Sequence, residues 1–133
     1  MRSISFSVCT VDEVIRVSEQ VNNFLVSAGI KNATTIYKAS LCVEEMASNV
    51  VNHGFKKDSK EHSCDIRIIV ENDNTIVMRI RDDCPLFNVK ERYACIDKGD
   101  VCSNLGIKLV FAVADEVSYI KLLDLNTVQI KIR

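Results

Sequence analysis

Three polar side chains recur at intervals of four in the stretch VEEMASNVVNHGF, residues 43–55. They are Glu45, Asn49 and His53, and on a helix this spacing would align them along one ridge. A carboxylate can orient or deprotonate a nucleophile, and an amide oxygen can bind a hard cation such as magnesium. The spacing therefore predicts a site for metal-assisted chemistry on a rigid helix or, as the simpler alternative, a solvated helix face.

A second set of polar groups follows a hydrophobic run in IRDDCPLF, residues 80–87. Here a strand would end in Asp82 and Asp83, and the chain would then turn at Pro85. A carboxylate fixed at a strand end can accept a directional hydrogen bond from an amino group such as that of adenine. The structural alternative is a simple turn in which an aspartate caps backbone amides.

Two further features are less distinctive. The stretch NLGIKLV, residues 104–110, places Gly106 where a loop enters a helix, and the first amides of that helix could face a phosphate. Thr127 belongs to a β-rich run near the end of the sequence, where ordinary strand propensity explains a threonine. Neither feature predicts a site by itself.

The composition is that of an ordinary globular protein. The 133 residues include 17 basic and 18 acidic side chains, for a net charge of -1, and 47% are hydrophobic. We therefore expect a single domain over residues 1–133, and the absence of a basic block gives no support for nucleic-acid binding. No signal peptide is apparent and no apolar run approaches the roughly 18 residues of a spanning helix, so we expect a cytoplasmic protein without a membrane partner.

The six cysteines form no CxxC pair, which argues against a zinc knuckle or a thioredoxin-like site. A disulfide framework is not expected either, and most of them should be reduced, partly buried apolar residues. They are Cys9, Cys42, Cys64, Cys84, Cys95 and Cys102.

The first elements that would position these groups are a strand and a helix. Residues 3–9 alternate polar and apolar side chains, as in a half-buried strand. Thr10 and Glu13 fit a capping box at a helix start, apolar residues then recur at helical spacing, and Gly29 is a plausible end.

A second helix should run from about Thr34 or Thr35 to His53, with Gly54 as its stop. At about 100° per residue, Glu45 and the other ridge residues fall roughly opposite its apolar side. This helix should have one buried face and one chemically distinctive face. The apolar positions are Ile36, Ala39, Val43, Ala47 and Val50.

The rest of the chain predicts adjacent pairs of strands, which favours a largely antiparallel sheet with helices on one face, a two-layer α/β sandwich. Residues 83–104 show little periodicity and are expected to form a lid or binding loop. The other expected elements are a polar loop at 56–63, strands at 64–71 and 75–82 joined by a turn at 72–74, a short helix at 105–114, and strands at 117–123 and 127–132.

In this order the motifs resemble the GHKL ATPase superfamily of histidine kinases, gyrase and Hsp90. The shared pattern is EExxxNxxxH on a helix, a strand ending in Asp-x-small, a lid, a glycine and a hydrophobic residue at a helix start, and a late threonine. HG after the asparagine motif and Pro-x-Phe after the aspartate are most similar to the anti-sigma factor serine kinases of bacteria. The resemblance covers nearly the whole chain and implies the Bergerat-type ATP-binding fold.

The resemblance also implies a role for each matching residue. Glu45 would be the general base, Asn49 would bind Mg²⁺ on the triphosphate, and Asp82 would accept a hydrogen bond from the adenine amino group. His53 matches a recurrent histidine that is more plausibly structural than catalytic. The other implied nucleotide contacts are Cys84 after the aspartate, Leu105 and Gly106 where the lid meets the phosphates, and Thr127 supporting the adenine contact.

At three positions where this family commonly has glycine, the chain has Cys84, Asn104 and Asn126. The resemblance implies an ATP- and magnesium-dependent serine/threonine kinase that phosphorylates an antagonist protein and sequesters a sigma factor, with a homodimer formed through the first strand and helix. The sparse glycines keep open a second interpretation, an interaction module that is catalytically weak or inactive. A generic ATP-binding domain of a larger kinase is a third.

Overall fold

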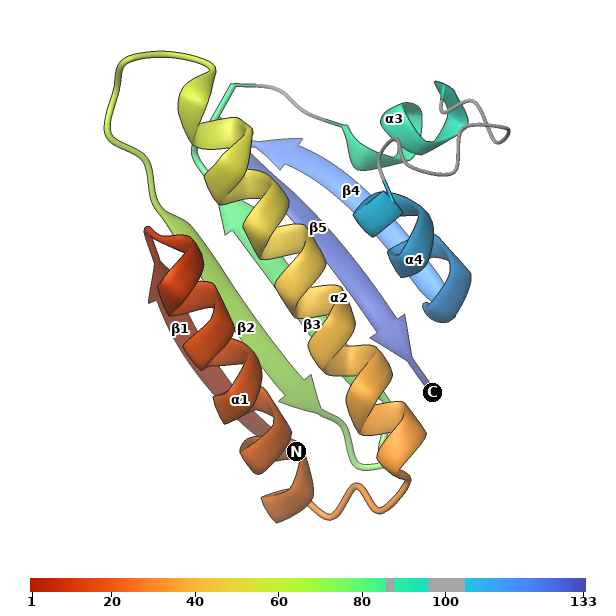
Figure 1. Ribbon diagram of the computed structural model, residues 1–133. Helices are drawn as coiled ribbons and strands as arrows, with labels where there is room; N and C mark the ends of the chain where they lie inside the picture. The colour runs from red at the N-terminus through yellow and green to blue at the C-terminus, as the bar shows by residue number, and fades with distance from the viewer. Residues whose placement is uncertain (86–87, 96–104) are drawn as a thin grey trace.

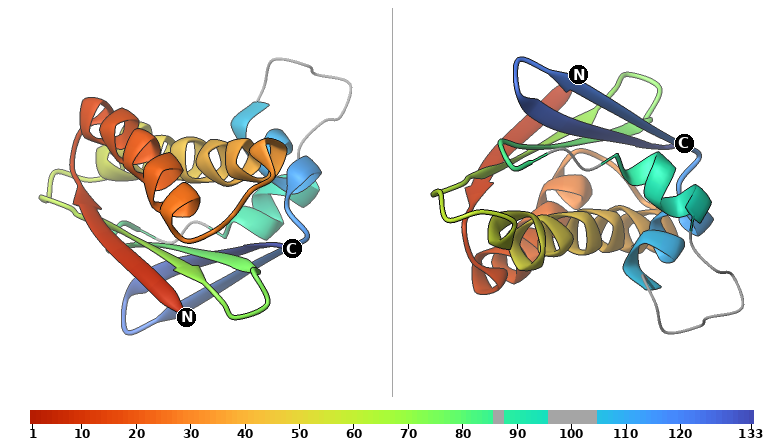
Figure 2. Two further views of the ribbon diagram at one scale, coloured as in Figure 1. Left: turned by 90° about the horizontal axis from the view of Figure 1, so that it is seen from below. Right: turned by 90° about the horizontal axis from the view of Figure 1, so that it is seen from above.

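Helices and sheet form two layers in the computed structural model, which describes residues 1–85, 88–95 and 105–133. Helices α1 (Val11–Ser27) and α2 (Ala33–Asn52) lie side by side across one face of the sheet, with α4 (Leu105–Val113) next to α2 (Figure 1). Viewed along the sheet, the described helices all lie on this face (Figure 2). The predicted two-layer α/β sandwich is confirmed.

The sheet has five strands in the order β1-β2-β3-β5-β4, and every neighbouring pair is antiparallel. Such an arrangement follows from sequence-adjacent strands that pair as hairpins. The strands are β1 (Arg2–Val8), β2 (Cys64–Val70), β3 (Ile76–Asp82), β4 (Glu116–Leu122) and β5 (Leu125–Ile132).

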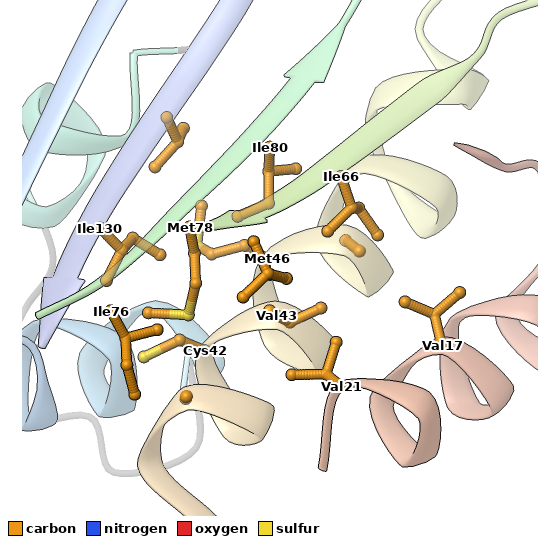
Figure 3. Packing of buried hydrophobic residues seen from close by; sticks show 14 of the residues in the cluster. Val17, Val21, Cys42, Val43, Met46, Ile66, Ile76, Met78, Ile80 and Ile130 are labelled. Atoms are coloured by element: carbon orange, nitrogen blue, oxygen red, sulfur yellow. The ribbon is translucent and has the colours of Figure 1, made fainter. Parts of the chain in front are cut away.

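The core fills the space between the two layers. Across the sheet, Ile66 pairs with Ile80 and Met78 pairs with Ile130, and all four side chains are buried. The side chain of Met46 on α2 points toward these residues, as Figure 3 shows. Because side chains alternate along a strand, this packing fixes which residues of each strand face the helices.

The predicted helix start at Thr10 is present. The Glu13 amide donates to Thr10 Oγ1 at 3.2 Å, whereas the Glu13 carboxylate accepts from the Cys9 amide at 3.1 Å. Helix α2 begins at Ala33, before the predicted Thr34 or Thr35, because Asn32 Oδ1 accepts hydrogen bonds from both threonine amides and so acts as the N-cap.

Residues 83–104, expected to form a lid or binding loop, are helical over part of their length. Helix α3 (Val89–Cys95) lies within this segment, and the Tyr93 ring stacks on Phe111 of α4 with centroids 4.1 Å apart. A short 3₁₀ helix, η1 (Gly54–Lys56), also follows α2, where Gly54 was expected to end the helix, and reaches only the first residue of the expected loop at 56–63. Residues 86–87 and 96–104 of the expected lid, including Ile96 and Asn104, lie outside the described residues.

Strand β5 begins at Leu125, two residues before its predicted start. Leu123 and Asp124 both have positive φ, 53° and 62°, which is the geometry of a two-residue hairpin turn. Neither residue is a glycine or an asparagine, so the usual sequence signal for this turn is missing. Among the described helices, none combines the length and apolar character needed to cross a membrane.

We expect Gly29→Ala to lower the free energy of unfolding by about 1 kcal/mol, because Gly29 has φ +94° and a β-carbon is strained there. The amides of Gly29 and Ile30 close α1 on the carbonyls of Val26 and Leu25, so the position is needed for the helix end. Apart from the neighbouring residues of the chain, no atom of the described residues lies within 4 Å of the added β-carbon, which leaves backbone strain as the cause.

Urea unfolding measures this effect, and Gly29→Asn is the matched control. Asparagine tolerates a left-handed backbone better than alanine, so its loss should be smaller. Equal losses for the two variants would contradict the explanation.

Candidate functional site

The polar ridge of α2 faces the first turn of α4 across a cavity of about 440 Å³. The structure thus brings together five residues that the sequence singled out in two separate motifs: Glu45, Asn49, His53, Leu105 and Gly106. The cavity is completed by Ser48, Asn52, Arg92 and Ile107.

Gly106 and Glu45 are in close contact. A β-carbon built on Gly106 would lie 2.2 Å from Glu45 Oε2, far inside van der Waals contact. The absence of a side chain therefore lets the first turn of α4 approach the carboxylate directly. The partial positive charge of a helix N-terminus also lies at this end of α4, which suits the binding of anionic groups.

The two adjacent glutamates of α2 have different surroundings. Glu44 accepts a hydrogen bond from Ser18 Oγ of α1 at 3.3 Å, whereas Glu45 receives none from any residue that the structure describes. Burial raises the pKa of Glu45, and the negative charge of Glu44 raises it further. A carboxylate with a raised pKa and a free oxygen lone pair is suited to accept a proton.

Asp82 ends β3 on the helix-facing side and is buried. Its Oδ1 accepts hydrogen bonds from the Cys84 amide at 3.0 Å and from Asn126 Nδ2 at 2.9 Å. The Tyr119 hydroxyl in turn donates to Asn126 Oδ1 at 2.5 Å. Asp82 therefore caps the turn after β3, as the structural alternative expected, and the Cys84 thiol also hydrogen-bonds to this carboxylate.

A smaller cavity of about 40 Å³ lies beside Asp82. Asn49 and His53 line both this cavity and the larger one, so the α2 ridge connects the surroundings of Glu45 with those of Asp82. Cys84 also lines the small cavity, which holds little more than a water molecule or two. A purine ring beside Asp82 would require neighbouring side chains to move.

Thr127 is not part of this group. Asn126 is the residue of β5 paired with Asp82, so the next residue, Thr127, faces the opposite side of the sheet. The expectation that the Thr127 hydroxyl supports a contact at Asp82 is therefore not supported, and the Asn126 amide occupies that place. Strand alternation from Asp82 could have identified Asn126 only if the register between β3 and β5 had been known.

Thr127 instead lines a larger hollow of about 520 Å³ on the uncovered face of the sheet, together with Arg67, Arg79 and Arg81. This hollow contains neither the α2 ridge nor the start of α4. The size of this hollow does not make it the reactive site. Glu45, whose pKa is raised, and the residues around it lie on the face of the sheet that the helices cover.

Arg92 lies outside the motifs recognised in the sequence, and it brings a positive charge to the larger cavity from α3. A signal was present, since Asn88 and Glu91 have the spacing of a helix cap. Asn88 Oδ1 accepts hydrogen bonds from the amides of Lys90 and Glu91 at 3.0 and 3.3 Å. That cap predicts a helix beginning at residue 89, and Arg92 then lies one turn inside it.

The two-layer fold is that of a GHKL ATPase domain. Residues 9–132 match the family described as histidine kinase-like ATPase domain, and the chain belongs to this family. Domains of this family bind ATP, typically with Mg²⁺. No match is found among curated proteins.

Among solved structures, the chain is similar to the crystal structure of the RsbU and RsbW domains of Rv1364c from Mycobacterium tuberculosis. The TM-score is 0.70 at 14% identity, over 100% of this chain and 32% of that one. It is also similar to the histidine kinase domain of the blue-light activated histidine kinase from Erythrobacter litoralis EL346, with a TM-score of 0.59 and 16% identity over 92% of this chain and 63% of that one.

A second structure of that blue-light activated histidine kinase gives a TM-score of 0.60 at 16% identity, over 94% of this chain and 42% of that one. The chain thus spans less than two thirds of the length of each of these structures. At such identities the similarity concerns the fold alone.

We expect Asn126→Ala to lower the free energy of unfolding by about 2 kcal/mol, because it removes one buried donor to the Asp82 carboxylate and the shorter of the hydrogen bonds to the Cys84 carbonyl. Thr127→Val, one residue along the same strand but on the other face, should change it by less than about 0.5 kcal/mol. Chemical denaturation of both variants measures the difference. Similar losses would show that the Asn126 contacts are not what stabilises this end of the sheet.

Proposed function

We propose that this chain is an ATP- and magnesium-dependent serine/threonine protein kinase of the anti-sigma factor type. It would phosphorylate a hydroxyl of a partner protein in the cytoplasm and regulate transcription by sequestering a sigma factor. The observation that carries the proposal is the direct approach of Gly106, at the start of α4, to the Glu45 carboxylate. Membership of the histidine kinase-like ATPase family and the fold similarity to a structure containing an RsbW domain support it.

The residues present fit a magnesium nucleotide. The Asp82 carboxylate can accept a hydrogen bond from an adenine amino group, and the first amides of α4 can face phosphate oxygens. Asn49 lies between these two places and offers the neutral oxygen that a hard cation prefers. Bound there, Mg²⁺ would neutralise negative charge on the phosphates.

In this function Glu45 accepts the proton of the attacking serine or threonine hydroxyl, while the hydroxyl oxygen bonds to the terminal phosphorus and ADP leaves. Arg92 adds positive charge to the same cavity. Phosphoryl transfer needs mainly positioning and charge stabilisation, so a rigid helix that holds the base is what the chain must supply.

We further infer a homodimer formed through β1 and α1. Strand β1 is an edge of the sheet, and α1 exposes Ile15 and Val26, at 45% and 63% of their surfaces. An unpaired edge strand and exposed apolar side chains both favour association.

A second candidate function is an interaction module with little or no catalytic activity. It is favoured by the small size of the cavity at Asp82 and by the engagement of one Asp82 oxygen with Cys84 and Asn126. In that case the fold would control a partner through its surface, and nucleotide would bind weakly or not at all.

Calorimetric titration with ADP and with a non-hydrolysable ATP analogue, each with and without Mg²⁺, distinguishes the two functions. We expect magnesium-dependent binding that Asp82→Asn weakens at least about tenfold through loss of the adenine contact. Glu45→Gln should bind nucleotide within about threefold of the wild type but lose at least about 100-fold in phosphoryl transfer, because only the proton acceptor is removed.

Thr127→Val is the matched control and should behave as wild type in both measurements. Wild-type protein that binds no nucleotide at millimolar concentration would rule out the kinase and leave the interaction module. Normal transfer by Glu45→Gln would instead show that another group accepts the proton.

The rate of transfer should also depend on pH through Glu45. Its pKa is raised by burial and by the charge of Glu44, so kcat/KM should fall as the pH is lowered through this raised value. Glu44→Gln removes the neighbouring charge, lowers the pKa of Glu45 and should move the acidic limb to lower pH. If the acidic limb of the pH profile of kcat/KM does not move in Glu44→Gln, Glu45 is not the titrating group.

The same shift predicts the sign of an effect on stability. Because folding raises the pKa of Glu45, the folded state favours the protonated form, and that stabilisation is lost as the pH rises through the raised pKa. Glu45→Gln should therefore unfold at a higher temperature than the wild type at pH 7, and the difference should shrink in acid.

A further inference from the structure

A cluster of polar side chains outside the Glu45 cavity connects the segment after α2 with the end of β3. At its centre is His62, whose side chain is only 4% exposed. Its Nε2 lies 2.5 Å from Asp58 Oδ1, and its Nδ1 lies 3.1 Å from Asp83 Oδ1. The Phe55 ring packs at a tilt against the imidazole, with centroids 5.9 Å apart.

The Cys84 thiol completes this cluster. One ligand atom each from His62, Asp83 and Cys84 lies within 4.8 Å of the other two, close enough to share a single ion. Cys84 is 3% exposed, and its Sγ would lie 3.1 Å from a β-carbon on Gly54, so the sulfur is held in place by packing. The Asp83 carboxylate is also fixed, by a hydrogen bond of 3.1 Å from the Ser63 amide.

The kinds of donor atom indicate which ion would bind. Imidazole nitrogen, carboxylate oxygen and thiolate sulfur together are typical ligands of zinc. Magnesium and calcium prefer oxygen ligands alone, so a site containing Cys84 is not suited to them. The surroundings of His62 also match a metal site, because a ligating histidine usually donates its other ring N–H to a carboxylate, which here is Asp58.

We propose that His62 Nδ1, Asp83 and Cys84 Sγ bind one Zn²⁺ ion, with Asp58 orienting the imidazole through Nε2. Three protein ligands leave a fourth position for water or another small ligand. Binding releases the thiol proton of Cys84 to solvent and places the ion on a residue that also lines the cavity at Asp82. The site does not depend on the proposed kinase function.

Titration of the full chain with Co²⁺, a spectroscopic substitute for Zn²⁺, tests the proposal. We expect one equivalent to produce a thiolate-to-cobalt charge-transfer band that Zn²⁺ then removes by displacement. Cys84→Ser should abolish the band, whereas His62→Ala and Asp83→Asn should weaken Co²⁺ binding at least about tenfold. Asp58→Asn should keep one ion per chain but reduce its affinity by about 10- to 100-fold, as expected of a residue that acts through His62.

Three of the other five thiols provide matched controls, and Cys9→Ser, Cys95→Ser and Cys102→Ser should each leave the band unchanged. A band that survives in Cys84→Ser, or that is lost in one of these controls, would overturn the proposal. So would the absence of any band in folded wild-type protein. Asp83 is 43% exposed, so Asp83→Asn should fold normally and keeps the test valid if Cys84→Ser does not fold.

Discussion

Burial of one side of α2 between α1 and the sheet is the constraint on which the other features of this protein depend. Val43, Met46 and Ala47 are almost completely removed from solvent. A helix fixed by these contacts cannot rotate about its axis without exposing them, so the direction of Glu45 and Asn49 is fixed as well. The same burial that stabilises the fold therefore positions the polar ridge opposite α4.

The sheet provides the other half of the site through a change of residue type along its helix-facing side. The row formed by Ile66, Ile80 and Val128 is apolar, and the next row toward the end of β3 contains Asp82 and Asn126. The core ends where hydrogen-bonding groups replace methyl groups. Asp82 can be buried there because Asn126 and the turn after β3 donate to it, which offsets the loss of water.

Much of this arrangement could be predicted from local sequence. The capping box at Thr10, the end of α1 at Gly29 and the apolar periodicity of α2 each depend on a few neighbouring residues, and all appear in the structure. Features that depend on distant residues were not predictable in this way. Predicting that Asn126, and not Thr127, lies beside Asp82 requires the register of β3 with β5, and no local sequence pattern specifies that register.

Helix α3 has a local signal in its Asn88 cap, but seven residues rarely form a stable helix alone, and this one also packs on α4 through Tyr93 and Phe111.

The turn after β3 shows how the chain manages without a glycine at Cys84. A side chain at that position needs space, and the facing Gly54 supplies it, because a β-carbon there would approach the Cys84 sulfur to 3.1 Å. The Asn126 amide also binds the Cys84 carbonyl at 3.0 Å and so holds the backbone of the turn. A glycine at residue 84 would leave this turn more flexible. Cysteine instead of glycine at residue 84 therefore makes the turn beside Asp82 less flexible and places a thiol there.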